Sequence, residues 1–137
     1  MRKVLVVVIV LVVAALALPA AASGRPLDAT LTGAAEVPVS GDPDGSGSAS
    51  VTLNQGLGEV CWDITFAGIA APFAAHIHVG EAGVNGPVVV PLNTSSGCVD
   101  GVDKDLIKDI RQNPSDYYVN VHNADFPGGA LRGQLEK

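Results

Sequence analysis

Two neighbouring segments alternate strictly between apolar and polar side chains, and this pattern constrains the fold more than any other feature. In residues 47–53, the apolar side chains Ala49, Val51 and Leu53 share one face, and small polar side chains occupy the other. Residues 59–66 alternate in the same way, with an apolar side chain at every even position. A period of two is typical of a half-buried strand. Because a glycine-containing turn at residues 54–58 separates the two runs, they predict a β-hairpin.

Six further segments are candidate strands, and turn residues separate nearly all of them. They cover residues 27–33, 74–79, 87–92, 97–102, 117–122 and 130–136. Many short strands at this spacing predict an all-β, antiparallel sandwich or barrel of about eight strands. One short helix is predicted near residues 103–112, because Asp103 can cap it, an apolar stripe follows, and Pro114 ends it.

The amino-terminal segment has the order of a cleavable signal peptide. Arg2 and Lys3 precede an uncharged apolar run of 15 residues, 4–18, and small residues follow at 20–23. A bilayer-spanning helix needs about 20 apolar residues, so a cleaved signal is favoured over a membrane anchor. The sequence therefore predicts a signal peptide at residues 1–22 and a single β domain at residues 23–137. We expect secretion, or retention in a periplasm or cell wall, without stable membrane insertion after cleavage.

The charge of the predicted mature chain is strongly negative. Cleavage removes Arg2 and Lys3, which leaves six basic side chains against fourteen acidic ones. A nucleic-acid-binding protein would show a basic stripe, and this sequence has none. The balance also disfavours anionic lipid. If the chain has a partner, we expect an extracellular protein or polymer, and the sequence does not identify it.

The sequence contains two cysteines, Cys61 and Cys98. An even number of cysteines in an exported chain indicates a disulfide. The alternatives are free thiols or metal ligands. Because the two cysteines are 37 positions apart, their spacing matches no zinc-knuckle pattern, and an exported chain meets an oxidising compartment, so the disulfide is favoured.

All three histidines of the chain fall in two strand-like segments. His76 and His78 are two positions apart, so their side chains share one face of a strand. His122 ends another strand and shares its face with Tyr118 and Asn120. If the two strands are neighbours, three imidazoles converge. Three neutral imidazoles suit copper or zinc and leave a fourth position open.

Polar residues near the histidines could complete such a site. Glu81, Asp125 and Asp63 supply carboxylates that could act as ligands or orient the imidazoles. Tyr118 and Asn120 could donate or accept hydrogen bonds on the same face. Arg132 could bind a carboxylate ligand, pair with Asp125 or Glu136, or hold a carbonyl oxygen of a turn.

Three classes of function remain open at this point. The first is an extracellular binding module whose histidines bind copper or zinc, and the second is a structural or adhesive module whose histidines are purely architectural. The third is a superoxide dismutase-like metalloenzyme, which we do not favour because that site needs more ligands than three imidazoles. A hydrolase is disfavoured as well, because the sequence has no Gly-x-Ser-x-Gly motif.

Several ordered blocks resemble the CHRD domain, the module named after chordin. They are LTGAAEVP at 31–38, AHIH at 75–78, GPVV at 86–89, YVNVH at 118–122, PGG at 127–129 and RGQL at 132–135. The chain departs from the family pattern at Asn123, where a threonine is usual, and at Ala130, where an acid is usual. The resemblance covers nearly all of the predicted mature chain. It implies an extracellular, Greek-key-like β module, and it implies no particular reaction.

Overall fold

The computed structural model describes residues 25–137, so the predicted signal peptide lies outside the described residues. Within them, eight strands form one antiparallel sheet in the order β5-β4-β7-β8-β1-β2-β3-β6. The strands are β1 (Leu27–Thr32), β2 (Ser46–Asn54), β3 (Glu59–Ala67), β4 (Pro72–Val79), β5 (Val88–Leu92), β6 (Ser96–Val99), β7 (Tyr117–Asn123) and β8 (Leu131–Gln134). The all-β prediction of about eight short strands is confirmed.

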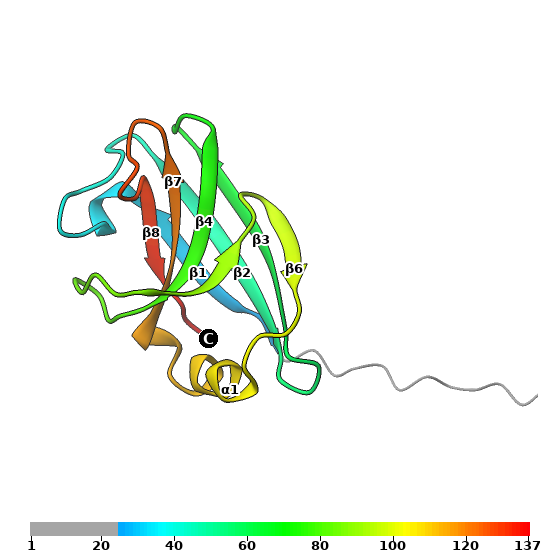
Figure 1. Ribbon diagram of the computed structural model, residues 1–137. Helices are drawn as coiled ribbons and strands as arrows, with labels where there is room; N and C mark the ends of the chain where they lie inside the picture. The colour runs from blue at the N-terminus through cyan, green and yellow to red at the C-terminus, as the bar shows by residue number, and fades with distance from the viewer. Residues whose placement is uncertain (1–24) are drawn as a thin grey trace, which may run out of the picture.

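The sheet curls into a nearly closed barrel (Figure 1). Its two edge strands, β5 and β6, are consecutive in sequence, and a short connection brings them together. The backbone N–H of Ile64 on β3 donates to the carbonyl oxygen of Ser95 in that connection, at 2.6 Å. The connections from β3 to β4 and from β6 to β7 cross the ends of the barrel instead of joining neighbouring strands. Between the two predicted architectures, the structure therefore selects a barrel with Greek-key-like crossings.

The predicted hairpin is the β2–β3 pair, and its register explains the alternation seen in the sequence. Val51 pairs with Trp62 and Leu53 with Val60, so the apolar faces of both strands point into the barrel. The outward residues Thr52 and Cys61 are also opposite each other. Cys61 continues across to Cys98 on β6, with which it forms the predicted disulfide.

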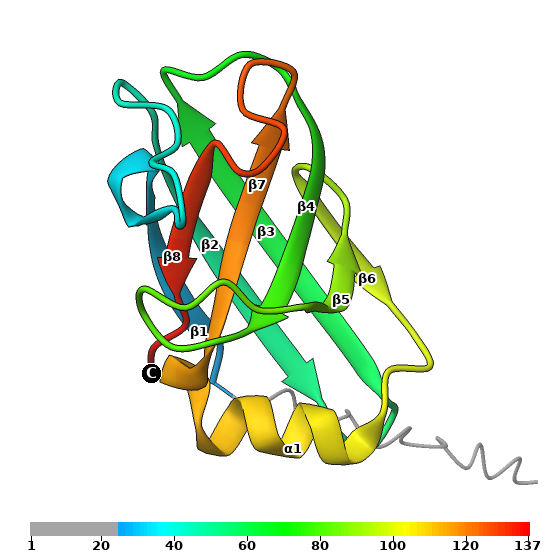
Figure 2. The same ribbon diagram turned by 60° about the vertical axis from the view of Figure 1, so that its left-hand side comes forward.

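The helix α1 (Lys104–Gln112) lies across one end of the barrel (Figure 2). As expected, Asp103 caps it: the carboxylate accepts hydrogen bonds from the N–H groups of Asp105 and Leu106 at 2.7 and 3.1 Å. Ile107 and Ile110 are fully buried against the barrel core, so the helix closes this end with its apolar face. In residues 25–137, no helix is both long enough and apolar enough to cross a bilayer.

The strand β7 differs from the others because it is buried on both faces. All seven of its residues are buried. Val119 and Val121 belong to the barrel core, whereas Tyr118, Asn120 and His122 point outward. Figure 2 shows the connection between β4 and β5, residues 80–87, crossing in front of β7 and β8. This segment covers part of the outer face of these strands, and the three predicted histidine ligands lie on that face.

Candidate metal centre

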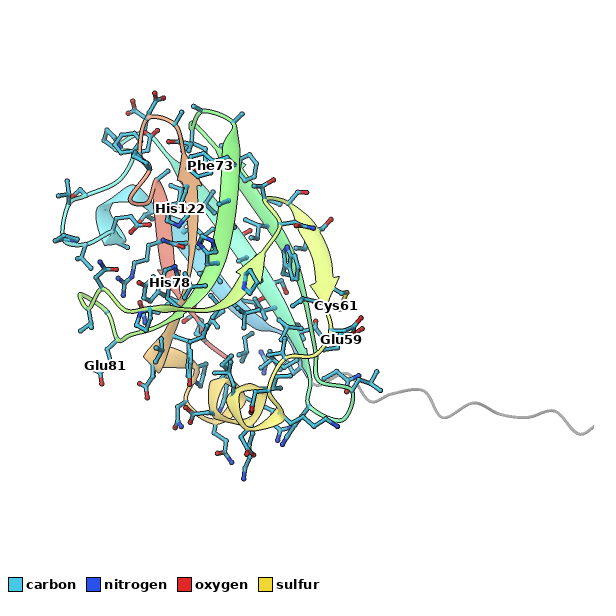
Figure 3. The ribbon with its side chains drawn as sticks, in the orientation of Figure 1. Glu59, Cys61, Phe73, His78, Glu81 and His122 are labelled. Atoms are coloured by element: carbon cyan, nitrogen blue, oxygen red, sulfur yellow. A yellow bond between two sulfur atoms is a disulfide. The ribbon has the colours of Figure 1, made fainter. Side chains whose placement is uncertain are left out.

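The antiparallel pairing of β4 with β7 brings the three histidines together. Ala74 pairs with His122, His76 with Asn120, and His78 with Tyr118. His122 therefore lies diagonally across from His76, on the same outer face. The Nδ1 atom of His76 is 3.1 Å from the Nε2 atom of His122. One ring nitrogen from each histidine falls within a group of atoms no more than 4.8 Å apart. The structure thus places the three predicted ligands in one cluster; Figure 3 labels two of them, His78 and His122.

Backbone carbonyl groups determine which nitrogen of His78 and His122 carries the proton. The Nδ1 of His78 is 2.8 Å from the carbonyl oxygen of Gly86, and the Nδ1 of His122 is 3.1 Å from that of Pro127. A carbonyl oxygen only accepts, so both Nδ1 atoms donate and both Nε2 atoms keep a lone pair. Metal-binding histidines are commonly oriented in this way.

The Nε2 atom of His78 has no hydrogen-bond partner although it is buried. The side chain itself is only 8 % exposed. A buried lone pair without a partner is unusual, because it has lost the hydrogen bond that water would supply. The His122 Nε2 faces the same region, 3.0 Å from the side-chain oxygen of Asn120. Two acceptors at this distance do not bond to each other, so a shared cation, a rotated amide or a proton donated by the Nδ1 of His76 must satisfy the His122 Nε2.

The environment favours uncharged imidazoles. Burial lowers the pKa of His76, and the neighbouring rings of His122 and His78 lower this pKa further. Burial also lowers the pKa of His122, although its bond to Pro127 acts in the opposite direction. Neutral imidazoles present lone pairs, so these shifts favour the form of His76 and His122 that binds a metal ion.

A stack of three side chains supports His78 from the side. The Tyr118 ring lies parallel to the His78 ring, with 4.8 Å between their centroids. The guanidinium carbon of Arg132 lies 3.5 Å from the centre of the same Tyr118 ring. Because β7 runs between β4 and β8, the Tyr118 ring has His78 on one face and Arg132 on the other. This stacking limits rotation of the His78 ring.

Arg132 attaches the covering segment to the barrel. Its guanidinium donates to the carbonyl oxygens of Val84 and Glu81 at 2.9 and 2.8 Å, and to the side chain of Gln134 at 2.9 Å. Of the three roles considered for Arg132, the structure shows that it holds turn carbonyls. Gln134 reinforces the attachment by donating to the carbonyl oxygen of Gly80 at 2.9 Å.

The three predicted carboxylates do not join the histidine cluster. The side chains of Glu81, Asp125 and Asp63 are exposed, and none of them belongs to the group of potential ligand atoms. Figure 3 shows Glu81 at the edge of the molecule, away from His78 and His122. Glu81 contributes to the site through its backbone carbonyl, which accepts a hydrogen bond from Arg132. Such a backbone contact cannot be predicted from the residue type.

Several contacts of this site involve residues to which the sequence assigns no role. The acceptors for His78 and His122 are the backbone carbonyls of Gly86 and Pro127. Phe73, which is 61 % exposed, stacks beside the His122 ring at a centroid distance of 6.4 Å. Asn123, one of the departures from the family pattern, is fully buried and accepts from the N–H of Phe126 at 2.8 Å. It thereby shapes the turn that contains Pro127.

Comparison with protein families finds a match that covers the whole barrel. The model of the CHRD domain matches residues 27–135. Comparisons with the curated proteins and with the solved structures find no match. The family and the disulfide are consistent with an extracellular location. Since the matched region spans most of the sequence and contains all three histidines, the chain belongs to the CHRD domain family.

Proposed function

We propose that this protein is an extracellular binding module that binds one copper or zinc ion through His76, His78 and His122. The observation that carries the proposal is the buried, unpartnered Nε2 of His78. Its ring cannot turn to find another partner without breaking the bond from Nδ1 to Gly86. A metal ion would satisfy this lone pair together with those of the two neighbouring imidazoles.

Two further features support a preorganised site. The rings of His78 and His122 are buried and held by backbone carbonyls, so little side-chain freedom remains to be lost on binding. His76 is only half-buried, which leaves the cluster a route to solvent. Three protein ligands leave a fourth coordination position for water or a small ligand.

Titration of the metal-free protein with Zn²⁺ and Cu²⁺ tests the proposal. We expect one ion per chain. His122→Ala should weaken binding by more than the roughly 10–100-fold that loss of an outer hydrogen-bond partner costs. Asp63→Asn is the matched control, because this exposed carboxylate lies outside the cluster. At a metal concentration one hundred times Kd, binding should stabilise the fold by about 2.7 kcal/mol, a Tm increase on the order of 10 °C.

The competing interpretation is that the histidines are architectural. The 3.1 Å contact between His76 and His122 favours it, because that pair can form a hydrogen bond without a metal. If neither ion binds at micromolar concentrations, or if His78→Ala leaves affinity unchanged, the metal proposal is wrong and this interpretation stands. A superoxide assay on copper-loaded protein tests whether the protein is instead a superoxide dismutase-like metalloenzyme.

A further inference from the structure

A hollow lies at one end of the barrel, beside α1. It has a volume of about 240 Å³ and is lined by Arg25, Pro26, Leu27, Leu53, Arg111 and Lys137. Leu27 begins β1 and Leu53 is near the end of β2, so the hollow opens at the end of the barrel that α1 covers. Figure 2 shows α1 next to the ends of these strands and to the carboxyl-terminal end of the chain. The mouths of barrels are common ligand sites.

The floor of the hollow is apolar and belongs to the barrel core. Leu27 and Leu53 are 3 % and 6 % exposed, and both are members of the core cluster. Pro26 adds an apolar wall. An apolar group entering the hollow would therefore contact core side chains, and its burial would be favourable. The volume is below the roughly 300–1,000 Å³ of typical drug-sized sites, so the occupant must be small.

The rim of the hollow carries an unusual concentration of positive charge. Residues 25–137 contain six basic side chains, and three of them, Arg25, Arg111 and Lys137, line this one hollow. No aspartate or glutamate is among the described residues that line it. Arg111 donates one hydrogen bond to the side chain of Gln55 at 2.8 Å, which leaves other donors of its guanidinium free to bind an anion. In a chain with net negative charge, this grouping selects for an anionic ligand.

We infer that this mouth of the barrel binds a small amphiphilic carboxylate, with its alkyl chain against Leu27 and Leu53 and its carboxylate at Arg111, Arg25 and Lys137. Both parts of the ligand are required. The alkyl chain supplies apolar contact, while the carboxylate meets the basic rim and can accept two parallel hydrogen bonds from an arginine. The inference is independent of metal binding, because the hollow shares no residue with the histidine cluster.

Octanoate is the probe, titrated calorimetrically into the purified protein at low salt with EDTA present. We expect saturable binding at one site with a Kd of about 1 mM, as the size of the ligand allows. Binding should weaken at high salt, because the rim charges are exposed. The uncharged analogue 1-octanol and the short acid acetate should each bind at least about tenfold more weakly, because each lacks one of the two contacts.

A matched pair of double variants separates the effect of the rim charges on octanoate binding from the effect of the protein's overall charge. Arg111→Ala with Lys137→Ala should weaken octanoate binding by about tenfold, since each exposed charge contributes up to about 1 kcal/mol. Lys104→Ala with Lys108→Ala removes the same charge from α1 but not from the hollow, and it should leave the affinity unchanged. Equal weakening in both double variants would overturn the inference.

A second measurement does not depend on how the variants fold. In the wild-type protein, octanoate should shift the methyl resonances of Leu27 and Leu53, while those of the buried Leu131, which does not line the hollow, should stay in place. Absence of saturable binding up to about 10 mM, or equal binding of 1-octanol and octanoate, would contradict the proposed ligand class.

Discussion

The His78 imidazole donates from Nδ1 to the carbonyl oxygen of Gly86 at 2.8 Å, and its Nε2 is left buried without a partner. A connection between strands, rather than another strand, therefore orients His78, the most buried histidine of the cluster. The position of this connection depends on Arg132, Gln134 and Tyr118, all of which bond to its backbone.

The backbone at Gly86 has no room for a side chain. A Cβ atom built there would lie 1.6 Å from the carbonyl oxygen of Val79. Gly86→Ala should therefore displace the segment, lower the free energy of unfolding by at least about 2 kcal/mol and weaken metal binding. Gly128→Ala is the matched control, since no atom lies within 4 Å of its added Cβ. Urea denaturation measures the free energy of unfolding, and metal titration measures the affinity. If Gly86→Ala and Gly128→Ala had equal stability and equal metal affinity, Gly86 would not be what holds His78 in place.

Substitution of Arg132 should affect both stability and the histidines, although Arg132 contacts no predicted ligand in the hydrogen-bond network. Arg132→Lys keeps the charge but loses the planar group that reaches Val84, Glu81 and Gln134 together. We expect a loss of stability on the order of 3 kcal/mol and roughly tenfold or greater weakening of metal affinity. Arg111→Lys is the control, because Arg111 is exposed; it should change stability and metal affinity far less. Unchanged metal affinity in a folded Arg132→Lys variant would show that the segment 80–87 does not control the site.

The buried carboxyl group of Glu36 should make stability depend on pH. Burial raises its pKa from 4.5 to about 7, while the charge of Arg132 acts in the opposite direction. Because the folded state holds this proton more tightly, its contribution to stability is complete below pH 4.5 and is lost as pH rises through about 7. The free energy of unfolding falls by at most about 3 kcal/mol, because each pH unit between the two pKa values contributes about 1.4 kcal/mol.

Glu36→Gln cannot ionise, so it isolates this contribution from those of the histidines. The unfolding free energy of the variant minus that of the wild type should increase between about pH 4.5 and about pH 7. Urea denaturation at intervals across this range measures the difference. A difference that stays constant with pH would mean that Glu36 ionises at the same pH in both states.

The disulfide should stabilise the barrel without influencing the histidines. Cys61 and Cys98 join β3 to β6, whereas the histidines lie on β4 and β7. Replacing both cysteines by alanine should cost about 4 kcal/mol, as expected for a closed loop of 37 positions. Metal affinity of the folded variant should equal that of the wild type. A large change in affinity would instead indicate that closure of the barrel at β6 is coupled to the site.

The sequence by itself determined the β2–β3 hairpin, because an alternation of period two indicates which side chains face the core. The predicted segments 47–53 and 59–66 agree with β2 and β3 to within one residue at every end. The carboxyl-terminal prediction, 130–136, was longer than β8 because Glu136 joins Asp28 only by an isolated bridge. Helix α1 was equally predictable, since its cap and apolar stripe are local features.

Only the tertiary structure decided how the strands are ordered and what surrounds the histidines. The i, i+2 spacing places His76 and His78 on one face, but the register of β4 with β7 brings His122 to them. Residue type also suggested Glu81, Asp125 and Asp63 as partners, and their side chains remain exposed. The acceptors for His78 and His122 are instead backbone carbonyls at Gly86 and Pro127. Every residue has such a carbonyl, so only the folded path of the chain determines which of them meets an imidazole.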